Sequence, residues 1–179
     1  GHNRTMPFIV FEGLDGSGKS SLMDRLEQAL KKNNFTVVRT REPGGTPLGE
    51  NLRHLILRTE GTAPTPRTEL LLYEAIRAQH VDEVIQPALK KNSWVLCDRF
   101  AASSIAFQAG GRAITAADVE GLNQFATQGL QPDLTVLLDL SVAKSVQRRQ
   151  QREKNSGVAA DRIEKESSEF HQRVRDSFL

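Results

Sequence analysis

The sequence predicts one three-layer α/β domain, in which helices flank a parallel sheet and a short lid closes over one edge. Two observations lead to this fold class. Short apolar runs alternate with helical patterns along the chain, which favours βαβ units and a sheet covered on both faces. The first apolar run is also followed by a glycine-rich segment, residues 13–20, and then by a helical pattern. This order suits a phosphate-binding loop, and 179 residues suffice for one full core.

Four segments are expected to form strands, because each is a short run of apolar or β-branched residues. These segments are residues 8–11, 36–40, 94–98 and 134–138. The first leads directly into the glycine-rich segment. The third ends in an aspartate, so a carboxylate is expected at the carboxyl edge of the sheet.

Helical spacing predicts three helices of clear length. The first follows the glycine-rich segment, where apolar residues recur from Leu22 to Leu30. A long helix is predicted over residues 68–91, with a bend near Pro87. Another is predicted over residues 115–128, with its first threonine as the N-cap.

Residues 13–20 fit the P-loop pattern G-x-x-x-x-G-K-[ST]. Glycines let successive N–H groups point at one anion, and the following helix N-terminus adds partial positive charge. Lys19 then reaches the β- and γ-phosphates, and the hydroxyl of Ser20 binds Mg²⁺. The chain is therefore predicted to bind a nucleoside triphosphate. The residues expected to contact ATP are Gly13, Leu14, Asp15, Gly16, Ser17, Gly18, Lys19, Ser20 and Ser21.

Asp98 is the candidate carboxylate beside the metal, because it closes an apolar run and Arg99 follows it. The alternative is a surface ion pair at the end of a strand, and the P-loop favours the catalytic interpretation. The sequence contains no Asn/Thr-Lys-x-Asp signature of guanine-specific GTPases, so a GTP switch is not expected.

Three further groups have the chemistry of a phosphoryl acceptor site. Arg53 follows a tight glycine turn and suits an anion. Tyr73 and Arg77 are four residues apart and share a helix face, where they suit a nucleotide base, although ordinary helix packing explains the pair equally well. The basic residues of 148–154 lead into a flexible tip at 155–157. This end is either a solvated face or a lid that supplies arginine to phosphates.

Composition excludes several classes of protein. Twenty-four basic and 22 acidic residues give a net charge of +2, so neither nucleic acid nor a membrane is predicted as the main partner. Cys97 is the single cysteine, which excludes an intrachain disulfide and favours a reducing, cytoplasmic compartment. Its apolar neighbours predict an inert core thiol. The four histidines lack ligand spacing, so no zinc site is expected.

Several short motifs occur in one order along the chain. They are Glu12-Gly13-x-Asp15-Gly16-x-Gly18-Lys19, Arg41-Glu42-Pro43-Gly44-Gly45-Thr46, Asp98-Arg99-Phe100 with Ser103-Ser104, Phe107-Gln108, Gly111-Arg112, Pro132-Asp133-Leu134 and Asp161-Arg162-Ile163-Glu164. Together they resemble bacterial thymidylate kinases, a group of nucleoside monophosphate kinases, from residue 8 to the last residue. The resemblance implies a P-loop NTPase fold with a lid at about residues 148–161, and phosphoryl transfer from MgATP to dTMP, giving dTDP and ADP.

The resemblance also implies roles for individual residues. Tyr73 would stack on thymine, Arg77 would bind the thymine edge, and Arg53 with Arg99 would hold the dTMP phosphate. The residues assigned to catalysis are Asp15, Lys19, Arg99, Arg149 and Arg152. The residues assigned to dTMP are Asp15, Glu42, Pro43, Arg53, Tyr73, Arg77, Arg99, Ser104, Phe107 and Gln108. The residues assigned to Mg²⁺ are Ser20 and Asp98.

The sequence departs from the family pattern in a few places. Phe107 stands where the family usually has tyrosine, and Ala109 replaces a common glycine. Family members usually continue beyond a lid helix, here about residues 161–179, into another strand and helix that this sequence lacks. Residues 1–5 are interpreted as a remnant of cloning, and residues 6–179 as the kinase domain.

Two other functions are compatible with these residues. A related P-loop kinase would phosphorylate another nucleotide or nucleoside, which a comparison of acceptors would reveal. A nucleotide-binding protein without kinase activity would bind dTMP and ATP but show no turnover. Family members are generally homodimers, and the apolar long helix around residues 70–89 is compatible with dimerisation.

Overall fold

Four parallel strands form the centre of the fold, in the order β2-β3-β1-β4. They appear in the computed structural model, which describes residues 7–179, as β1 (Phe8–Glu12), β2 (Val37–Arg41), β3 (Trp94–Asp98) and β4 (Leu134–Leu137). The four predicted strands are therefore confirmed, with bounds that differ by at most one residue. The interpretation of residues 1–5 as a remnant of cloning lies outside the described residues.

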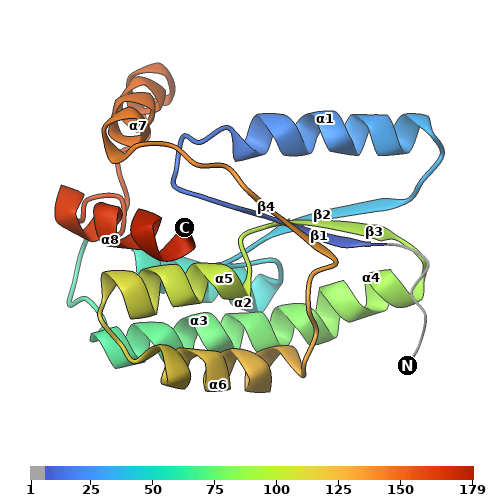
Figure 1. The fold of residues 1–179 in the computed structure, drawn as a ribbon, viewed down its shortest axis with the longest axis horizontal. Helices are drawn as coiled ribbons and strands as arrows, with labels where there is room; N and C mark the ends of the chain where they lie inside the picture. The colour runs from blue at the N-terminus through green and yellow to red at the C-terminus, as the bar shows by residue number, and fades with distance from the viewer. Residues whose placement is uncertain (1–6) are drawn as a thin grey trace.

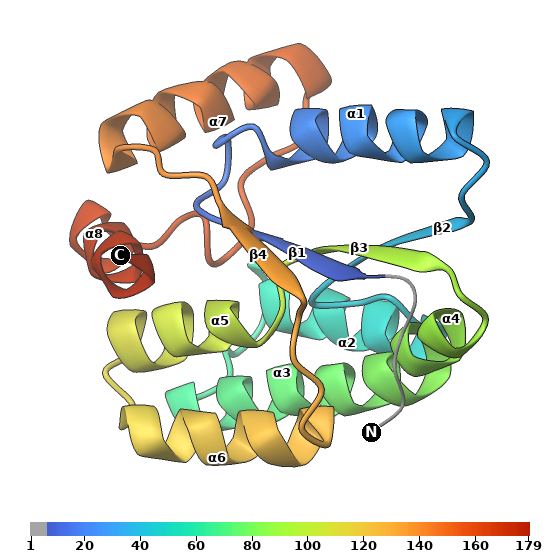
Figure 2. The ribbon, with the colours of Figure 1, turned by 45° about the vertical axis from the view of Figure 1, so that its right-hand side comes forward.

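Helices cover both faces of this sheet (Figure 1), so the predicted three-layer class is confirmed. The helical elements are α1 (Lys19–Lys32), α2 (Pro47–Leu57), α3 (Pro66–His80), η1 (Val81–Ile85), α4 (Gln86–Lys90), α5 (Ala101–Ser104), η2 (Ile105–Gly111), α6 (Ala116–Thr127), α7 (Val142–Ser156) and α8 (Ser168–Phe178). Helices α1 and α7 lie on one side of the sheet, and α2 to α6 lie on the other (Figure 2).

The predicted long helix is continuous from α3 through η1 to α4. Its π-helical turn, η1, ends two residues before Pro87, where a proline removes one backbone donor and crowds the preceding turn. The irregularity therefore sits where the bend was expected. Helix α6 begins after Thr115 as predicted, although the Thr115 side chain makes no capping hydrogen bond.

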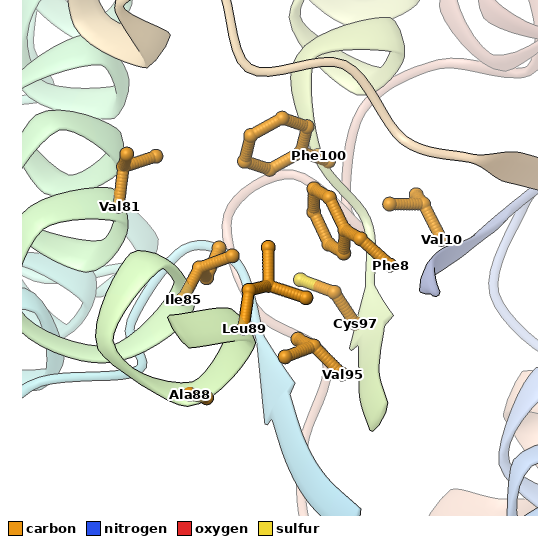
Figure 3. Packing of buried hydrophobic residues seen from close by; sticks show 9 residues of the cluster. All are labelled: Phe8, Val10, Val81, Ile85, Ala88, Leu89, Val95, Cys97 and Phe100. Carbon is orange, nitrogen blue, oxygen red and sulfur yellow. The ribbon is translucent and has the colours of Figure 1, made fainter. Parts of the chain in front are cut away.

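The largest apolar cluster lies between the sheet and the long helix (Figure 3). Phe8 and Phe100 meet edge to face with ring centroids 5.0 Å apart, and Ile85 and Leu89 of the helix pack beside them. Cys97 belongs to this cluster and has no exposed surface. Burial raises the pKa of the Cys97 thiol, so its prediction as an inert core residue is confirmed.

The helix formed by α5 and η2 was not predicted. Its sequence of alanines, serines and glycines lacks the apolar spacing that marks the other helices. The helix is explained by its packing against α8. The two helices approach so closely that a Cβ on Gly111 would lie 2.5 Å from the ring of Phe170. Helix α8 therefore packs against η2 at a separation that only glycine permits.

The segment after α7 differs from the predicted lid helix. Helix α7 continues to Ser156, and Gly157 ends it with φ +72°. Residues 157–167 then form a non-helical strap, so the expected helix over residues 161–179 exists only from Ser168. The strap is held on α2, because the backbone N–H of Arg162 donates to Leu57 O at 2.9 Å.

Candidate active site

The P-loop joins β1 to α1 at the carboxyl edge of the sheet. Gly13 has φ +134°, and a Cβ there would lie 2.4 Å from the carbonyl oxygen of Leu138. Gly18, with φ +98°, precedes the first turn of α1. The hydroxyl of Ser17 is buried and has no hydrogen-bond partner among residues 7–179. An unpaired donor beside the helix N-terminus fits an anionic ligand such as a phosphate group.

Lys19 is 6 % exposed and lies between two oxygens of the carboxyl edge. Its Nζ is 3.1 Å from Gly13 O and 3.2 Å from Asp98 Oδ1. This contact is set by the sheet register, in which Phe11 of β1 pairs with Asp98 of β3. Burial and the cation of Arg99 lower the pKa of Lys19, although Asp98 opposes them.

A single cleft of about 520 Å³ lies at this edge of the sheet. It receives most of the predicted site residues, from segments that lie far apart in the sequence. The predicted residues that line it are Asp15, Gly16, Ser17, Gly18, Lys19, Ser20, Ser21, Glu42, Pro43, Arg53, Tyr73, Arg77, Asp98, Arg99, Ser104, Phe107, Gln108 and Arg152. Gly13, Leu14 and Arg149 are the predicted residues that do not line it.

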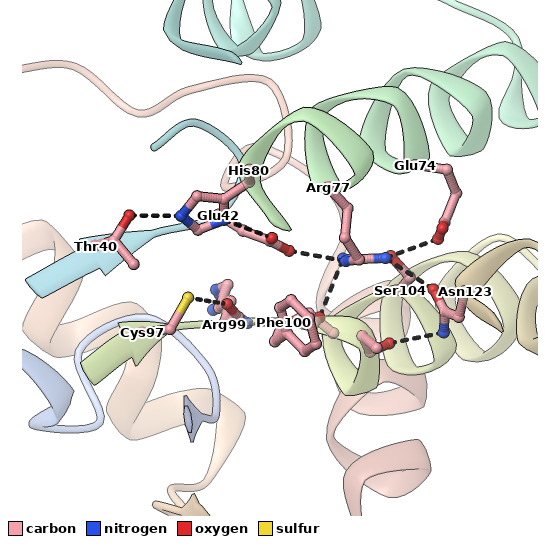
Figure 4. Close-up of polar contacts among 12 residues, drawn as sticks. Thr40, Glu42, Glu74, Arg77, His80, Cys97, Arg99, Phe100, Ser104 and Asn123 are labelled. Carbon is pink, nitrogen blue, oxygen red and sulfur yellow. Dashed lines mark hydrogen bonds and ion pairs between the residues drawn. The ribbon is translucent and has the colours of Figure 1, made fainter. Parts of the chain in front are cut away.

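Arg77 of α3 is the centre of a buried polar network at the inner end of the cleft (Figure 4). Its Nε donates to Glu42 Oε1 at 2.8 Å, and its Nη1 reaches Glu74 Oε1 at 2.7 Å. Nη1 also contacts Ser104 Oγ and Asn123 Oδ1, while Nη2 donates to Phe100 O at 3.1 Å. Nη2 has a second N–H, for which no partner is found among residues 7–179.

Charge balance keeps this network in place. Arg77 is only 2 % exposed, so burial alone would lower its pKa, but Glu42 and Glu74 outweigh that effect and the pKa is raised. Burial raises the pKa of Glu74 despite the arginine, and its Oε2 has no partner among the described residues. His80 contacts the other oxygen of Glu42, with Nδ1 2.7 Å from Oε2.

Arg99 lies where the P-loop meets the part of the cleft that α2 and α3 line. Its backbone has φ +70°, and the turn is held by Glu12, whose Oε1 accepts from the N–H of Phe100 at 2.8 Å. The Arg99 guanidinium lies 4.9 Å from the centre of the Phe107 ring and 3.7 Å from Asp15 Oδ1. Burial alone would raise the pKa of Asp15, but the cations of Arg99, Lys19 and Arg152 together outweigh it and the pKa is lowered.

Arg53 of α2 and Tyr73 of α3 line the same part of the cleft. Arg53 is fixed on the glycine turn, because its Nη1 donates to Pro43 O at 2.8 Å. Burial and the nearby cation of Arg41 lower the pKa of Arg53, although the carboxylates of Glu50 and Asp161 oppose them. Burial raises the pKa of Tyr73, so its phenol stays neutral at physiological pH.

Arginines from α7 reach the cleft from the side opposite α3. Arg152 Nη2 lies 2.6 Å from Glu164 Oε2, and Arg148 Nη1 donates to Gly16 O at 2.9 Å. These residues are one helical turn apart and share a face. Arg149 lies three residues before Arg152 but does not line the cleft: its side chain is 13 % exposed, and its Nε lies 3.8 Å from Glu153 Oε1. Arg148 and Arg152 therefore line the cleft, whereas Arg149 does not.

Several residues of this site carry no assigned role in the sequence analysis. Glu12 and Glu164 belong to the motifs, but neither position by itself indicates which atoms it contacts. Asn123 gives no signal at all, since it lies 46 residues from Arg77 and reaches it only through the packing of α6 on α3. Asp98 and Ser20 are the candidates for Mg²⁺, and residues 7–179 contain no cluster of three His, Cys, Asp or Glu side chains around one metal.

Comparisons with known proteins give a consistent result. The sequence profile described as "Thymidylate kinase" matches residues 11–179. A thymidylate kinase of Bdellovibrio bacteriovorus is 67 % identical over 174 residues, which cover 97 % of this chain and 81 % of that protein. One of Pelobacter propionicus is 47 % identical, with 96 % and 79 % covered. The crystal structure of an Ehrlichia chaffeensis thymidylate kinase superposes with a TM-score of 0.76 at 34 % identity, over 97 % of this chain and 79 % of that one.

Proposed function

This chain belongs to the thymidylate kinase family, and we propose that it transfers the γ-phosphate of ATP to dTMP, giving ADP and dTDP. One observation supports this most directly. The cleft has the P-loop at one end and a buried arginine, a glutamine and two aromatic rings at the other. A phosphate donor and a base-bearing acceptor therefore have separate binding groups within one cavity.

Thymine fits the inner end of the cleft by its hydrogen-bond pattern. Its O4 accepts from the free Nη2 donor of Arg77, and its N3–H donates to Gln108 Oε1. The ring of Tyr73 stacks on the base, and Ser104, whose Oγ contacts Arg77, lies beside it. Cytosine would present a donor to the arginine and an acceptor to the glutamine, so the pocket favours a 4-oxo pyrimidine.

The acceptor phosphate lies between the base pocket and the P-loop. Arg53 and Arg99 supply its positive charges, and the carboxylate of Asp15 is placed to accept from a sugar hydroxyl. Glu42 and Pro43 form the turn that holds Arg53. Charge-assisted hydrogen bonds of this kind both bind the phosphate and set its direction of attack.

Transfer requires one bond to form and one to break. A nonbridging oxygen of the dTMP phosphate attacks the γ-phosphorus, and the bond to the β-γ bridging oxygen breaks, leaving ADP. The attacking phosphate is ionised at neutral pH, so no general base is needed. Lys19 and the lid arginines stabilise the charge that spreads over the equatorial oxygens, with Arg148 and Arg152 better placed than Arg149.

Mg²⁺ fits this donor set. Asp98 offers a carboxylate oxygen and Ser20 a hydroxyl, and Mg²⁺ is commonly held by one or two protein oxygens together with phosphates and water. When bound, the ion neutralises phosphate charge. We assign its protein contacts to these two residues.

A homodimer is proposed from the outer faces of three helices. The apolar residues of the long helix around 70–89 are mainly buried within the subunit, which leaves the outward positions of α2, α3 and α6 for association. Leu71 of α3 is 57 % exposed, Phe125 of α6 is 74 % exposed, and α2 exposes Leu48 and Leu55. Sedimentation equilibrium is expected to show a dimer, and Leu71→Lys is expected to weaken it.

A cytoplasmic location is also proposed, because the single Cys97 is buried and unpaired. No helix within residues 7–179 is long and apolar enough to cross a bilayer.

The reaction itself is tested by incubating the protein with MgATP and dTMP and identifying the products by chromatography. Formation of dTDP and ADP in equal amounts supports the proposal, and ATP hydrolysis without dTDP contradicts it.

A further inference from the structure

Gln108 of η2 lies between the cleft and a buried carboxylate. Its Nε2 donates to Glu69 Oε1 at 3.1 Å, and the two residues are 2 % and 1 % exposed. Gln108 also lines the cleft, and within residues 7–179 its Oε1 accepts no hydrogen bond. The carbonyl end of the amide is therefore the part left for a ligand.

The direction of this amide follows from the chemistry of Glu69. The two ends of a glutamine amide have nearly the same shape, so shape alone does not orient it. A carboxylate accepts hydrogen bonds and does not donate them, so the NH₂ group must face Glu69. Two cations hold this carboxylate in place: Arg112 Nε lies 3.1 Å from Oε1, and Arg162 contacts Oε2.

We propose that Glu69 is a positioning residue for base selectivity, because it fixes Gln108 with Oε1 toward the base. This inference rests on the proposed dTMP acceptor. The N3 of thymine carries a hydrogen and needs an acceptor, which Oε1 supplies. The N3 of cytosine is itself an acceptor, so it would form no hydrogen bond with Oε1 and the two acceptors would repel each other. If the amide were free to rotate, it would present its NH₂ group and accommodate cytosine.

The test compares kcat/KM for dTMP with kcat/KM for dCMP in wild type and in Glu69→Gln. The new amide at position 69 is able to donate to Gln108 Oε1, so the glutamine loses its fixed direction. The ratio of the two constants is expected to fall by about tenfold or more, mainly through a higher KM for dTMP. A ratio does not depend on the fraction of enzyme that is folded, so partial instability does not affect it.

Two variants sharpen this experiment. Glu166→Gln is the matched control, because Glu166 pairs with Arg112 at 2.9 Å but has no contact with Gln108. Glu69→Asp keeps a carboxylate for both arginines, but the shorter side chain moves it away from the amide of Gln108. This variant therefore replaces Glu69→Gln in the test if Glu69→Gln does not fold. Lower selectivity in either Glu69 variant, but not in Glu166→Gln, supports the inference. An unchanged ratio in every folded Glu69 variant, or an equal fall in Glu166→Gln, overturns it. Absence of dTMP turnover in wild type would instead overturn the proposed function, and this inference with it.

Discussion

The ammonium of Lys19 lies 3.2 Å from Asp98 Oδ1, so the P-loop lysine and the proposed metal ligand are paired in the free protein. In the proposed function both groups contact new partners when a nucleotide binds, because Lys19 is assigned to phosphate and Asp98 to Mg²⁺. Until then each neutralises the other at the buried edge of the sheet. The pair thus keeps two charged groups compatible with burial in the free protein.

Asp98→Asn is expected to lower kcat by on the order of 10²–10³-fold and to raise the Mg²⁺ concentration needed for half-maximal rate. The amide is a weaker ligand for a hard cation, and it no longer balances Lys19. Steady-state rates over a Mg²⁺ titration measure both effects. Asp139→Asn is the control, since Asp139 follows β4 but pairs with Arg175 outside the cleft. An equal loss in both variants would argue against a metal role for Asp98.

Arg152→Ala is expected to lower kcat by about 10³-fold or more, with a smaller change in the KM for dTMP. The reason is that Arg152 lines the cleft and is placed to stabilise transferring charge, whereas Arg149 faces Glu153. Arg149→Ala should therefore lose less activity than Arg152→Ala. Lys144→Ala, an exposed change in the first turn of α7, controls for the helix itself. The account of the lid fails if Arg149→Ala loses more activity than Arg152→Ala.

Arg77→Ala is expected to affect both stability and dTMP binding. Its removal leaves Glu42 and Glu74 buried without their cation, which typically costs about 3–5 kcal/mol of unfolding free energy. The lost donor to the base should raise the KM for dTMP by about tenfold or more. The Kd for ATP should stay unchanged, because the P-loop does not contact this network. Urea unfolding and calorimetric titration of each nucleotide give the three values. Equal weakening of ATP and dTMP binding would show that the fold, and not the base contact, was lost.

Glu74→Gln is expected to stabilise the protein increasingly as pH rises. Burial raises the pKa of Glu74 above its ordinary value of 4.5, so the folded protein holds this proton more tightly than the unfolded chain does. Between 4.5 and the raised pKa the unfolded chain binds fewer protons, and this residue makes the free energy of unfolding fall as pH rises. The amide of Glu74→Gln does not titrate, so this pH-dependent decrease in the free energy of unfolding is absent from the variant.

The measurement is the difference in unfolding free energy between variant and wild type over about pH 4 to 8. The difference should be flat at the acid end and then grow with pH. The exposed Glu60→Gln serves as the control. A difference that shrinks with rising pH would contradict the burial argument.

Much of the fold follows from local sequence signals. The strands are short β-rich runs, and Gly13 and Gly18 mark a loop that other residues cannot form. The helix of α5 and η2 could not be predicted in the same way, because its stability comes from contact with Phe170, 59 or more residues away in the sequence. The strap at 157–167 likewise depends on the contact between Arg162 and Leu57.

The site shows the same division. The motifs point to residues that now line one cleft, such as Lys19, Arg77 and Asp98. Their spacing does not show which side chains hold them. Asn123 is the clearest case, because it lies outside the motifs, yet its Oδ1 accepts from Arg77. The sequence also does not show which of two adjacent arginines contacts the P-loop. The orientation of α7 decides this, since Arg148 contacts Gly16 and Arg149 lies near Glu153.

The central claim is tested most directly by measuring ADP release with MgATP and dTMP beside dUMP, dCMP, thymidine and a blank without acceptor. The account predicts turnover of about 1–100 s⁻¹ with dTMP, weaker turnover with dUMP, which lacks the methyl group, and little with dCMP or thymidine. Thymidine lacks the phosphate that Arg53 and Arg99 are proposed to hold. Turnover that favours dCMP or thymidine over dTMP, or that is the same with and without dTMP, would contradict it.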